Sequence, residues 1–317
     1  MPLHTLWSQG AGLRVPILNA PMGGVAGGRL AAAVTAAGGL GMIGMGSTAT
    51  AASLSTELAA LGTTPRFGIG LVDWVIRAQP DLLETALAAR PTLLSVSFGA
   101  DLSWVDQAHA AGILAATQVY DTDSARRARD GGLDVLVARG AEGGGHGEIR
   151  LGTLPLLDAV LDAVEIPVLA AGGIAGPRSL AAVLAAGAAG AWLGTCLSAC
   201  PEALTGQVAR RTLIAAAGTD TVTTRAFDVG QRLNWPARFP SRVLANEFTD
   251  RWAGREDALA GDQEAGAQLA AGIAADDDRI APVDAGQGVG MLTDSRPVAV
   301  VLDELCAGAQ RLLARWN

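Results

Sequence analysis

The sequence contains no lysine, so all 23 basic residues among its 317 are arginine. Schiff-base enzymes, pyridoxal-phosphate enzymes and Walker-type nucleotide sites each require a lysine amine, which excludes the chain from these classes. Any phosphate that it binds must be held by backbone N–H groups, hydroxyl groups or arginine. Aromatic residues are also scarce, at 4%, whereas 50% of the residues are hydrophobic and can fill a large core.

Cysteine is also scarce, and the net charge is negative. The three cysteines, Cys196, Cys200 and Cys306, are too few for a disulfide framework and lack the neighbours that would complete a zinc site, so no metal is expected. The net charge of −8 argues against a nucleic-acid partner. No apolar run is long enough for a membrane span, and residues 1–10 lack signal-peptide features, so we expect a cytoplasmic protein that does not bind membranes.

Short apolar runs recur at a near-constant spacing, separated by stretches with helical periodicity. The predicted strands are Ile17–Ala20, Leu40–Gly44, Phe67–Leu71, Leu93–Phe98, Ile113–Val119, Val135–Arg139, Val168–Ala171 and Ala191–Gly194. The predicted helices between them are Gly28–Ala37, Ala51–Leu61, Leu82–Ala89, Trp104–Ala111, Ser124–Asp130, Leu154–Ala163 and Arg178–Ala186. Apolar strands that alternate with helices indicate a parallel sheet covered by helices. Eight evenly spaced units favour an α/β fold of the (β/α)8 TIM barrel type over a doubly wound open sheet.

The pattern changes after Thr195, where the segments become longer and more polar. We expect residues 198–284 to form a small helical domain inserted after the last strand. Its predicted helices are Pro201–Ala217, Ser241–Ala253 and Gln263–Ala275. Residues 1–197 and 285–317 would then form the barrel, which a C-terminal helix at Pro297–Arg315 completes.

Glycine-rich turns follow the last two predicted strands. One turn contains Gly172 and Gly173, and the other contains Gly194 and Thr195. Glycine lets the backbone approach a ligand closely and direct N–H groups at an anion. The alternative is that these glycines only make tight turns, but their position after consecutive final strands favours a phosphate site at the barrel mouth.

The segment after Val135–Arg139 reads Gly140-Ala-Glu-Gly-Gly-Gly-His146. It predicts a flexible loop that presents one imidazole at the barrel mouth, where active sites of this fold form. Histidine exchanges protons near neutral pH, so His146 is the candidate catalytic group. A lone histidine is more often structural, but a run of glycines beside it favours function. Of the other two histidines, His4 lies in the N-terminal tail and His109 lies within a predicted helix.

Two further loops can line the same mouth. Ala20 and Met22 follow the first strand and could lie against a flat apolar ring, although a simple turn explains them equally well. Gln118, near the end of the fifth strand, can similarly reach inward. Its alternative is a solvated polar side chain.

These motifs, in this order, resemble the nitronate monooxygenase family, formerly grouped as 2-nitropropane dioxygenases, over nearly the whole chain. The shared elements are Ala20-Pro21-Met22, Ala37–Gly41, the Glu142-to-His146 loop, Ala171–Ile174, Gly194-Thr195 and Ala285–Gly290. The resemblance implies an FMN-dependent barrel with a helical insertion that oxidises alkyl nitronates with O₂ to a carbonyl compound and nitrite. It also implies the site: His146 as the catalytic group, Gly172, Gly173, Gly194 and Thr195 at the FMN phosphate, and Ala20, Met22, Gln118 and Gly145 near the isoalloxazine.

The chain departs from the family pattern at three positions. Gly143 replaces alanine, Arg139 replaces glutamine, and Gly70 stands where many members have an asparagine that contacts the flavin. The phosphate elements are intact, so FMN binding is still expected, whereas substrate choice is open. Arg139 either attracts an anion or pairs with Glu142.

Three rival functions share this scaffold. The first is an FMN-dependent NAD(P)H:quinone or enoyl-acyl-carrier-protein reductase, which the Gly-Gly-His loop does not distinguish. The second is a relative of inosine-monophosphate dehydrogenase, which is disfavoured because the loop carries no cysteine nucleophile. The third is a binding protein without turnover. The expected partners are a small nitronate or other small anion and O₂, and the oligomeric state, a homo-oligomer included, is open.

The purified protein is expected to show the visible absorption bands of a flavin and to release FMN on denaturation, because its glycine turns hold a phosphate without lysine. Absorption spectra and chromatography of the released cofactor check this. A colourless protein that takes up no added FMN would contradict it.

Overall fold

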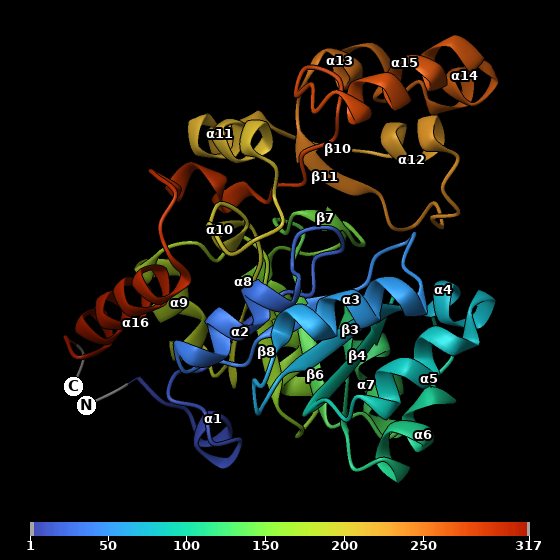
Figure 1. Ribbon diagram of the computed structural model, residues 1–317. Helices are drawn as coiled ribbons and strands as arrows, with labels where there is room; N and C mark the ends of the chain where they lie inside the picture. The colour runs from blue at the N-terminus through green and yellow to red at the C-terminus, as the bar shows by residue number, and fades with distance from the viewer. Residues whose placement is uncertain (1–2, 316–317) are drawn as a thin grey trace.

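The structure, a computed structural model that describes residues 3–315, is a closed barrel of eight parallel strands surrounded by helices (Figure 1). The strands follow the order β1-β9-β8-β6-β5-β4-β3-β2, and a parallel bridge between Leu18 and Leu40 joins the two ends. Their bounds are β1 Ile17–Asn19, β2 Met42–Gly44, β3 Gly68–Val72, β4 Leu93–Ser97, β5 Leu114–Val119, β6 Val135–Arg139, β8 Val168–Ala171 and β9 Gly190–Leu193. The predicted TIM barrel is confirmed.

Helices cover the outside of the barrel. The helices between the strands are α2 Gly28–Ala36, α3 Ala51–Leu61, α4 Asp73–Ala78, α5 Pro80–Ala88, α6 Trp104–Ala110, α7 Thr122–Asp130, α8 Thr153–Ala163 and α9 Pro177–Ala185. Helix α1, Leu6–Gly10, precedes the first strand, and the short α10, Thr195–Ser198, follows the last. The C-terminal helix α16, Val298–Leu313, packs against α9 and α2, as Figure 1 shows. No helix within residues 3–315 is both long and apolar enough to cross a membrane.

Apolar side chains fill both faces of the sheet, which explains the near-continuous apolar runs in the sequence. One cluster inside the barrel includes Leu18, Met42, Val137, Leu169 and Trp192. A second, larger cluster lies between the strands and the helices, and it takes up the alternate strand residues. Both faces of the barrel strands are therefore buried, except in β5, where Leu114 is exposed and two residues are half-buried.

The inserted segment lies over the carboxyl ends of the barrel strands (Figure 1). Its helices are α11 Gln207–Ala215, α12 Ala226–Gln231, α13 Glu247–Trp252, α14 Glu256–Gly261 and α15 Gln263–Ala274, with a 3-10 turn at η1 Gly218–Asp220. A second 3-10 turn, η2 Gln287–Met291, follows the insertion. The insertion also contains two antiparallel strands, β10 Thr221–Thr224 and β11 Ser241–Leu244. These strands form a small sheet with β7, Gly145–His146, which belongs to the loop after β6 and pairs with β11.

The expectation of an all-helical insertion was therefore wrong in part. The predicted helix Ser241–Ala253 begins as β11 and becomes helical only at Glu247, and Pro201–Ala217 is helical only over Gln207–Ala215. Gln263–Ala274 is helical as expected. The error has a physical cause: β11 forms by pairing with segments distant in the sequence, which local periodicity does not reveal. Whether residues 198–284 form a separate domain stays a prediction.

Close backbone packing explains part of the high glycine content. A Cβ atom at Gly41 would lie 1.8 Å from the carbonyl oxygen of Ala31, because α2 packs directly on the chain entering β2. A Cβ atom at Gly261, at the exposed end of α14, would meet nothing within 4 Å. The two glycines thus offer a crowded and an open site for the same substitution.

Gly41→Ala is expected to lower the free energy of unfolding by about 1–3 kcal/mol, because the extra methyl group forces α2 away from the barrel. Gly261→Ala is the matched control and should leave the stability nearly unchanged. Urea denaturation of both variants checks this, and equal midpoints would show that the α2 contact can adapt.

Candidate active site

A cavity of about 410 Å³ opens at the carboxyl ends of the barrel strands, beneath the inserted segment. Residues that directly follow β1, β8 and β9 line it, as expected for this fold. All the site residues predicted from the sequence lie in its wall, namely Ala20, Met22, Gln118, Gly145, His146, Gly172, Gly173, Gly194 and Thr195. The structure therefore brings the predicted set together, while the role of each residue stays a prediction.

The turns after β8 and β9 supply an anion cradle. Gly172 and Gly173 adopt positive φ values of 109° and 67°. The amides of Gly173 and Gly194 donate to no other backbone group in the described chain. The Thr195 hydroxyl accepts a hydrogen bond of 2.9 Å from the Gly286 amide, so its own hydrogen can be donated into the cavity. This donor set fits a phosphate.

Packing also constrains the first of these glycines. A Cβ atom at Gly172 would lie 2.8 Å from Thr153 Oγ1 and 2.9 Å from the carbonyl oxygen of Gly140. Packing and the positive φ therefore favour glycine at position 172, and its role at a ligand stays a prediction.

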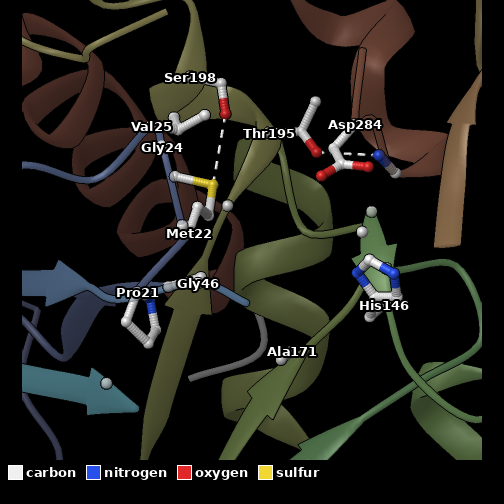
Figure 2. A pocket seen from close by; sticks show the side chains of 18 of the residues that line it. Pro21, Met22, Gly24, Val25, Gly46, His146, Ala171, Thr195, Ser198 and Asp284 are labelled. Carbon is white, nitrogen blue, oxygen red and sulfur yellow. Dashed lines mark hydrogen bonds between the residues drawn. The ribbon is translucent and has the colours of Figure 1, made fainter. Parts of the chain in front are cut away.

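The opposite wall is apolar and comes from the chain after β1. Figure 2 shows Pro21 and Met22 on one side of the cavity and His146 with Asp284 on the other, with Met22 Sδ accepting a hydrogen bond of 3.4 Å from Ser198. A Cβ atom at Gly70 would lie 2.2 Å from Pro21 Cγ. In this chain, the contact with Pro21 leaves no room for a side chain at position 70. A flat ring fits this side of the cavity.

Gln118 projects from the end of β5 into the cavity wall. Its Oε1 accepts a hydrogen bond of 3.2 Å from the Tyr120 hydroxyl, and its backbone amide donates to Ser97 Oγ at 3.2 Å. The side chain is therefore oriented by the protein, and its amide N–H groups remain available to a ligand.

His146 is held by residues of the inserted segment. Its Nε2 atom lies 2.9 Å and 3.1 Å from the two carboxylate oxygens of Asp228, on α12. Its ring stacks on Trp235 with the centroids 3.6 Å apart and the planes 7° from parallel. The His146 side chain is 17% exposed and that of Asp228 is 7% exposed. One edge and one face of the imidazole are thus fixed.

Aromatic residues from the barrel support this arrangement. Trp235 packs in T-shaped arrangements against Phe98 and Trp74, with the ring centroids 4.9 Å and 5.5 Å apart. Phe98 in turn contacts Phe239 at 5.4 Å. Several of the few aromatic residues of the chain thus gather where the insertion meets the barrel.

The loop that carries His146 is anchored along its length, so the expectation of a flexible loop was wrong. The Ala141 carbonyl accepts hydrogen bonds of 3.1 Å and 3.0 Å from Arg242. Gly145 and His146 pair with β11, and the Gly147 amide donates to the Pro240 carbonyl at 3.2 Å. Its glycines have packing reasons: a Cβ atom at Gly144 would lie 2.5 Å from the Gly286 nitrogen.

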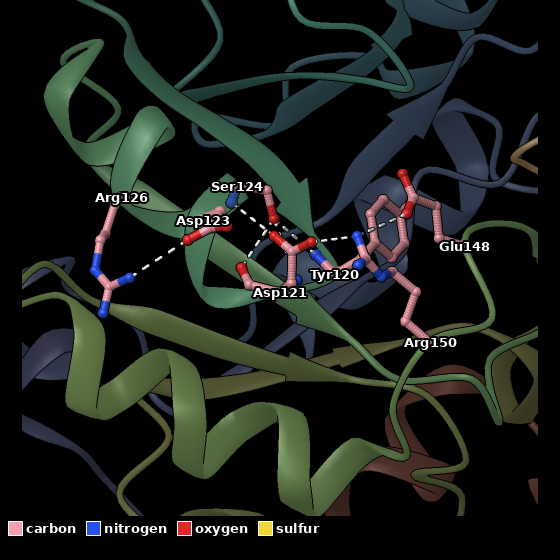
Figure 3. A network of polar contacts seen from close by, with 7 residues as sticks. All are labelled: Tyr120, Asp121, Asp123, Ser124, Arg126, Glu148 and Arg150. Atoms are coloured by element: carbon pink, nitrogen blue, oxygen red, sulfur yellow. Dashed lines mark hydrogen bonds and ion pairs between the residues drawn. The ribbon is translucent and has the colours of Figure 1, made fainter.

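The far end of the loop is fixed by charge. Figure 3 shows Arg150 reaching Asp121 at the start of α7, with Glu148 on its other side at 3.7 Å. Asp121 also caps α7 by accepting a 2.7 Å hydrogen bond from the Ser124 amide. Desolvation raises the pKa of Asp121, but the hydrogen bonds from Ser124 and the charge of Arg150 outweigh it and lower that pKa. Asp121 therefore remains an anion that Arg150 can hold.

Arg139 does not pair with Glu142, so that alternative for its role was wrong. Glu142 instead accepts hydrogen bonds from the Thr153 amide at 2.8 Å and the Thr153 hydroxyl at 2.9 Å. Arg139 Nη2 donates to the carbonyls of Gly143 at 2.9 Å and Gly145 at 3.0 Å. The arginine thus supports the loop from below.

Three residues of the site were not identified from the sequence: Asp228, Trp235 and Asp284. Asp284 lines the cavity and accepts a 2.8 Å hydrogen bond from Ser241. Desolvation by the surrounding protein atoms raises the pKa of the Asp284 side chain. The nearby charge of His146 opposes this shift. The adjacent Gly286–Gly290 motif was the one local signal for Asp284. Asp228 and Trp235 had none.

Comparisons with known proteins place the chain in one family, whose relatives carry more than one name. The family model described as nitronate monooxygenase matches residues 75–308. A nitronate monooxygenase of Paraburkholderia phytofirmans is 31% identical over 75% of this chain and 75% of its own length. The Rhodococcus jostii (3aS,4S,5R,7aS)-5-hydroxy-7a-methyl-1-oxo-octahydro-1H-indene-4-carboxyl-CoA dehydrogenase is 32% identical over 78% of this chain and 67% of its own length. Rv1533 of Mycobacterium tuberculosis is 40% identical over 55% of this chain, a match that spans only 44% of that protein.

Solved structures show the same architecture. A nitroalkane oxidase from Streptomyces ansochromogenes aligns with a TM-score of 0.82 and 28% identity, over 98% of this chain and all of its own. FabK from Thermotoga maritima aligns with a TM-score of 0.83 and 26% identity, over 96% of this chain and 95% of its own.

The raised pKa of Asp284 predicts a pH-dependent difference in stability between the protein and its Asp284→Asn variant. A carboxyl group whose pKa is higher in the folded than in the unfolded state binds its proton more tightly when folded, so stability falls as pH rises from the ordinary value of 3.8 through the folded pKa. The amide of the Asp284→Asn variant does not titrate, so the variant does not lose this stability. Asp284→Asn should therefore gain stability relative to the parent as pH rises through that window.

Urea denaturation of both proteins from pH 3.5 to 8 measures the difference. A variant that loses stability relative to the parent between these two pH values would show that the carboxylate is stabilised rather than strained in the fold.

Proposed function

This chain belongs to the nitronate monooxygenase family of flavin-dependent oxidoreductases, and from that premise we propose that it binds FMN in the cavity and oxidises alkyl nitronates. O₂ is the proposed oxidant, and a carbonyl compound and nitrite are the proposed products. The single observation that carries the proposal is the placement of His146, clamped by Asp228 and Trp235, in the wall of one cavity with all the other predicted residues.

The residues around the cavity fit FMN. Gly172, Gly173, Gly194 and Thr195 would hold its phosphate through amides and a hydroxyl, in keeping with a chain that has no lysine. Ala20, Met22, Gln118 and Gly145 would line its ring. Bound there, the flavin would supply the electron transfer and O₂ chemistry that side chains cannot.

The Asp228 contact determines what His146 can do. A carboxylate only accepts hydrogen bonds, so the Nε2 atom at 2.9 Å from Asp228 carries the imidazole hydrogen in this contact. Nδ1 is then the ring nitrogen left to accept a proton or to meet a substrate. Stacking on Trp235 fixes the ring plane, so the imidazole needs no reorientation during the reaction.

One alternative keeps support from the comparisons. A relative named as a carboxyl-CoA dehydrogenase is about as similar to this chain as the nitronate monooxygenase is. An FMN-dependent reductase or dehydrogenase on the same scaffold is therefore the second candidate. Rapid anaerobic bleaching of the flavin by NADH, with no bleaching by a nitronate, would favour it. The cytoplasmic location and a homo-oligomeric state stay predictions.

His146→Ala is expected to retain FMN but to lose about 100-fold or more of its turnover with propionate-3-nitronate, because the proton-handling group is removed. Asp228→Asn should retain the ring position and lose about 10-fold or more, because the amide can hold the wrong tautomer. Oxygen consumption and nitrite release measure both.

His109→Ala is the matched control, since His109 pairs with Asp134 at 2.9 Å on the surface and lines no part of the cavity. It should leave turnover unchanged. Full activity in His146→Ala would remove the catalytic assignment, and an absence of nitrite in the parent protein would remove the proposed reaction.

A further inference from the structure

Arg139, at the end of β6, is a buried cation that forms no direct ion pair within residues 3–315. Its relative exposure is 6%. Burial lowers the pKa of the guanidinium, yet an arginine stays protonated near neutral pH. Burying such a charge is costly unless something negative or electron-rich surrounds it.

The protein provides hydrogen-bond acceptors for only some of the N–H groups of this guanidinium. All three of its hydrogen bonds come from Nη2, at 2.9, 3.1 and 3.0 Å to the carbonyls of Gly143, Gly144 and Gly145. Within residues 3–315, Nε and Nη1 make no hydrogen bond. Five N–H donors share one charge on this side chain, so most of its donor capacity is left over.

Neighbouring glycines hold the guanidinium in this place. A Cβ atom at Gly147 would lie 2.4 Å from Arg139 Cζ, and one at Gly143 would lie 2.9 Å from Nε. The glycine at position 143, where the family motif has alanine, thus makes room for the arginine that replaces the family's glutamine. The two departures belong to one structural change.

Nearby carboxylates are engaged elsewhere. Glu142 accepts hydrogen bonds from Thr153, and Asp284 accepts one from Ser241. Arg139 is the one arginine among the described residues that line the cavity. Both carboxylates act on Arg139 electrostatically, but neither forms an ion pair with it among the described residues, so the cation faces the cavity with unused hydrogen-bond donors.

We propose that Arg139 is the binding subsite for the negative charge of the substrate, the charged head of a small planar oxyanion such as a nitronate. This inference rests on the proposed function, because it assigns a residue to the substrate of that reaction. Arginine suits the task, since charge-assisted N–H···O bonds to an anion are stronger than neutral ones. A glutamine in its place could donate hydrogen bonds but would bring no charge.

Binding of an isosteric pair of unreactive ligands tests this subsite without any turnover. Propionate carries the charge and propionamide has nearly the same shape without it. Titration of the flavin-loaded protein, followed by flavin absorbance and tryptophan fluorescence, is expected to show that propionate binds about 10-fold or more tightly than propionamide. Equal affinities would overturn the proposal even if every variant below failed to fold.

Variants then assign the preference to Arg139. Arg139→Gln should lose about 10- to 100-fold in propionate affinity and little in propionamide affinity, and Arg139→Lys should keep most of the preference for the anion. Arg126→Gln removes an exposed arginine of α7 and should change neither affinity. If Arg139 served only to hold the loop, both ligands would lose affinity together in Arg139→Gln, which would overturn the proposal.

The flavin is the other source of negative charge to be tested. If Arg139→Gln lowered the reduction potential of the flavin and left propionate affinity intact, the cation would belong to the cofactor, and the proposal would be overturned. The proposed reaction fails by a separate observation, the absence of nitrite from a nitronate, which leaves these binding results unaffected.

Discussion

The hydrogen bond between His146 and Asp228 joins the two parts of this molecule. The imidazole belongs to a loop of the barrel, whereas the carboxylate, 82 residues further along the chain, belongs to the inserted segment. The stacking partner Trp235 and the paired strand β11 come from the same segment. The insertion therefore contributes directly to the site. The barrel supplies the cavity, and the insertion sets the orientation and the available nitrogen of the histidine.

Small residues make this arrangement possible. Helix α2 lies directly on the backbone before β2 at Gly41, and the loop of His146 lies directly on Gly286 at Gly144. At the cavity itself, glycine turns leave backbone amides that can donate hydrogen bonds to an anion, in a protein that has no lysine. Glycine at positions 143 and 147 likewise leaves room for the Arg139 side chain beneath the loop. The high glycine content thus accounts for both the close backbone packing and the anion-binding groups at the cavity.

The sequence was sufficient for the barrel and for the identity of many cavity-lining residues. Strand and helix periods are local signals, and the carboxyl ends of parallel strands meet at one end of a barrel. Ala20, His146, Gly172 and Gly194 could therefore be placed together from the sequence alone. Local signals could not reveal Asp228 and Trp235, because only the pairing of β7 with β11 brings their segment to His146. The same long-range pairing turned part of a predicted helix into β11. The glycines beside His146 also suggested flexibility, whereas close packing explains them.

A crystal structure of the protein with FMN tests the central claim most directly. Flavin density is expected in the cavity between Met22 and His146, with the phosphate at the turns of Gly173 and Gly194 and with the Asp228 contact to Nε2 retained. Flavin bound elsewhere, or an imidazole that has left Asp228 and Trp235 and turned out of the cavity, would contradict it.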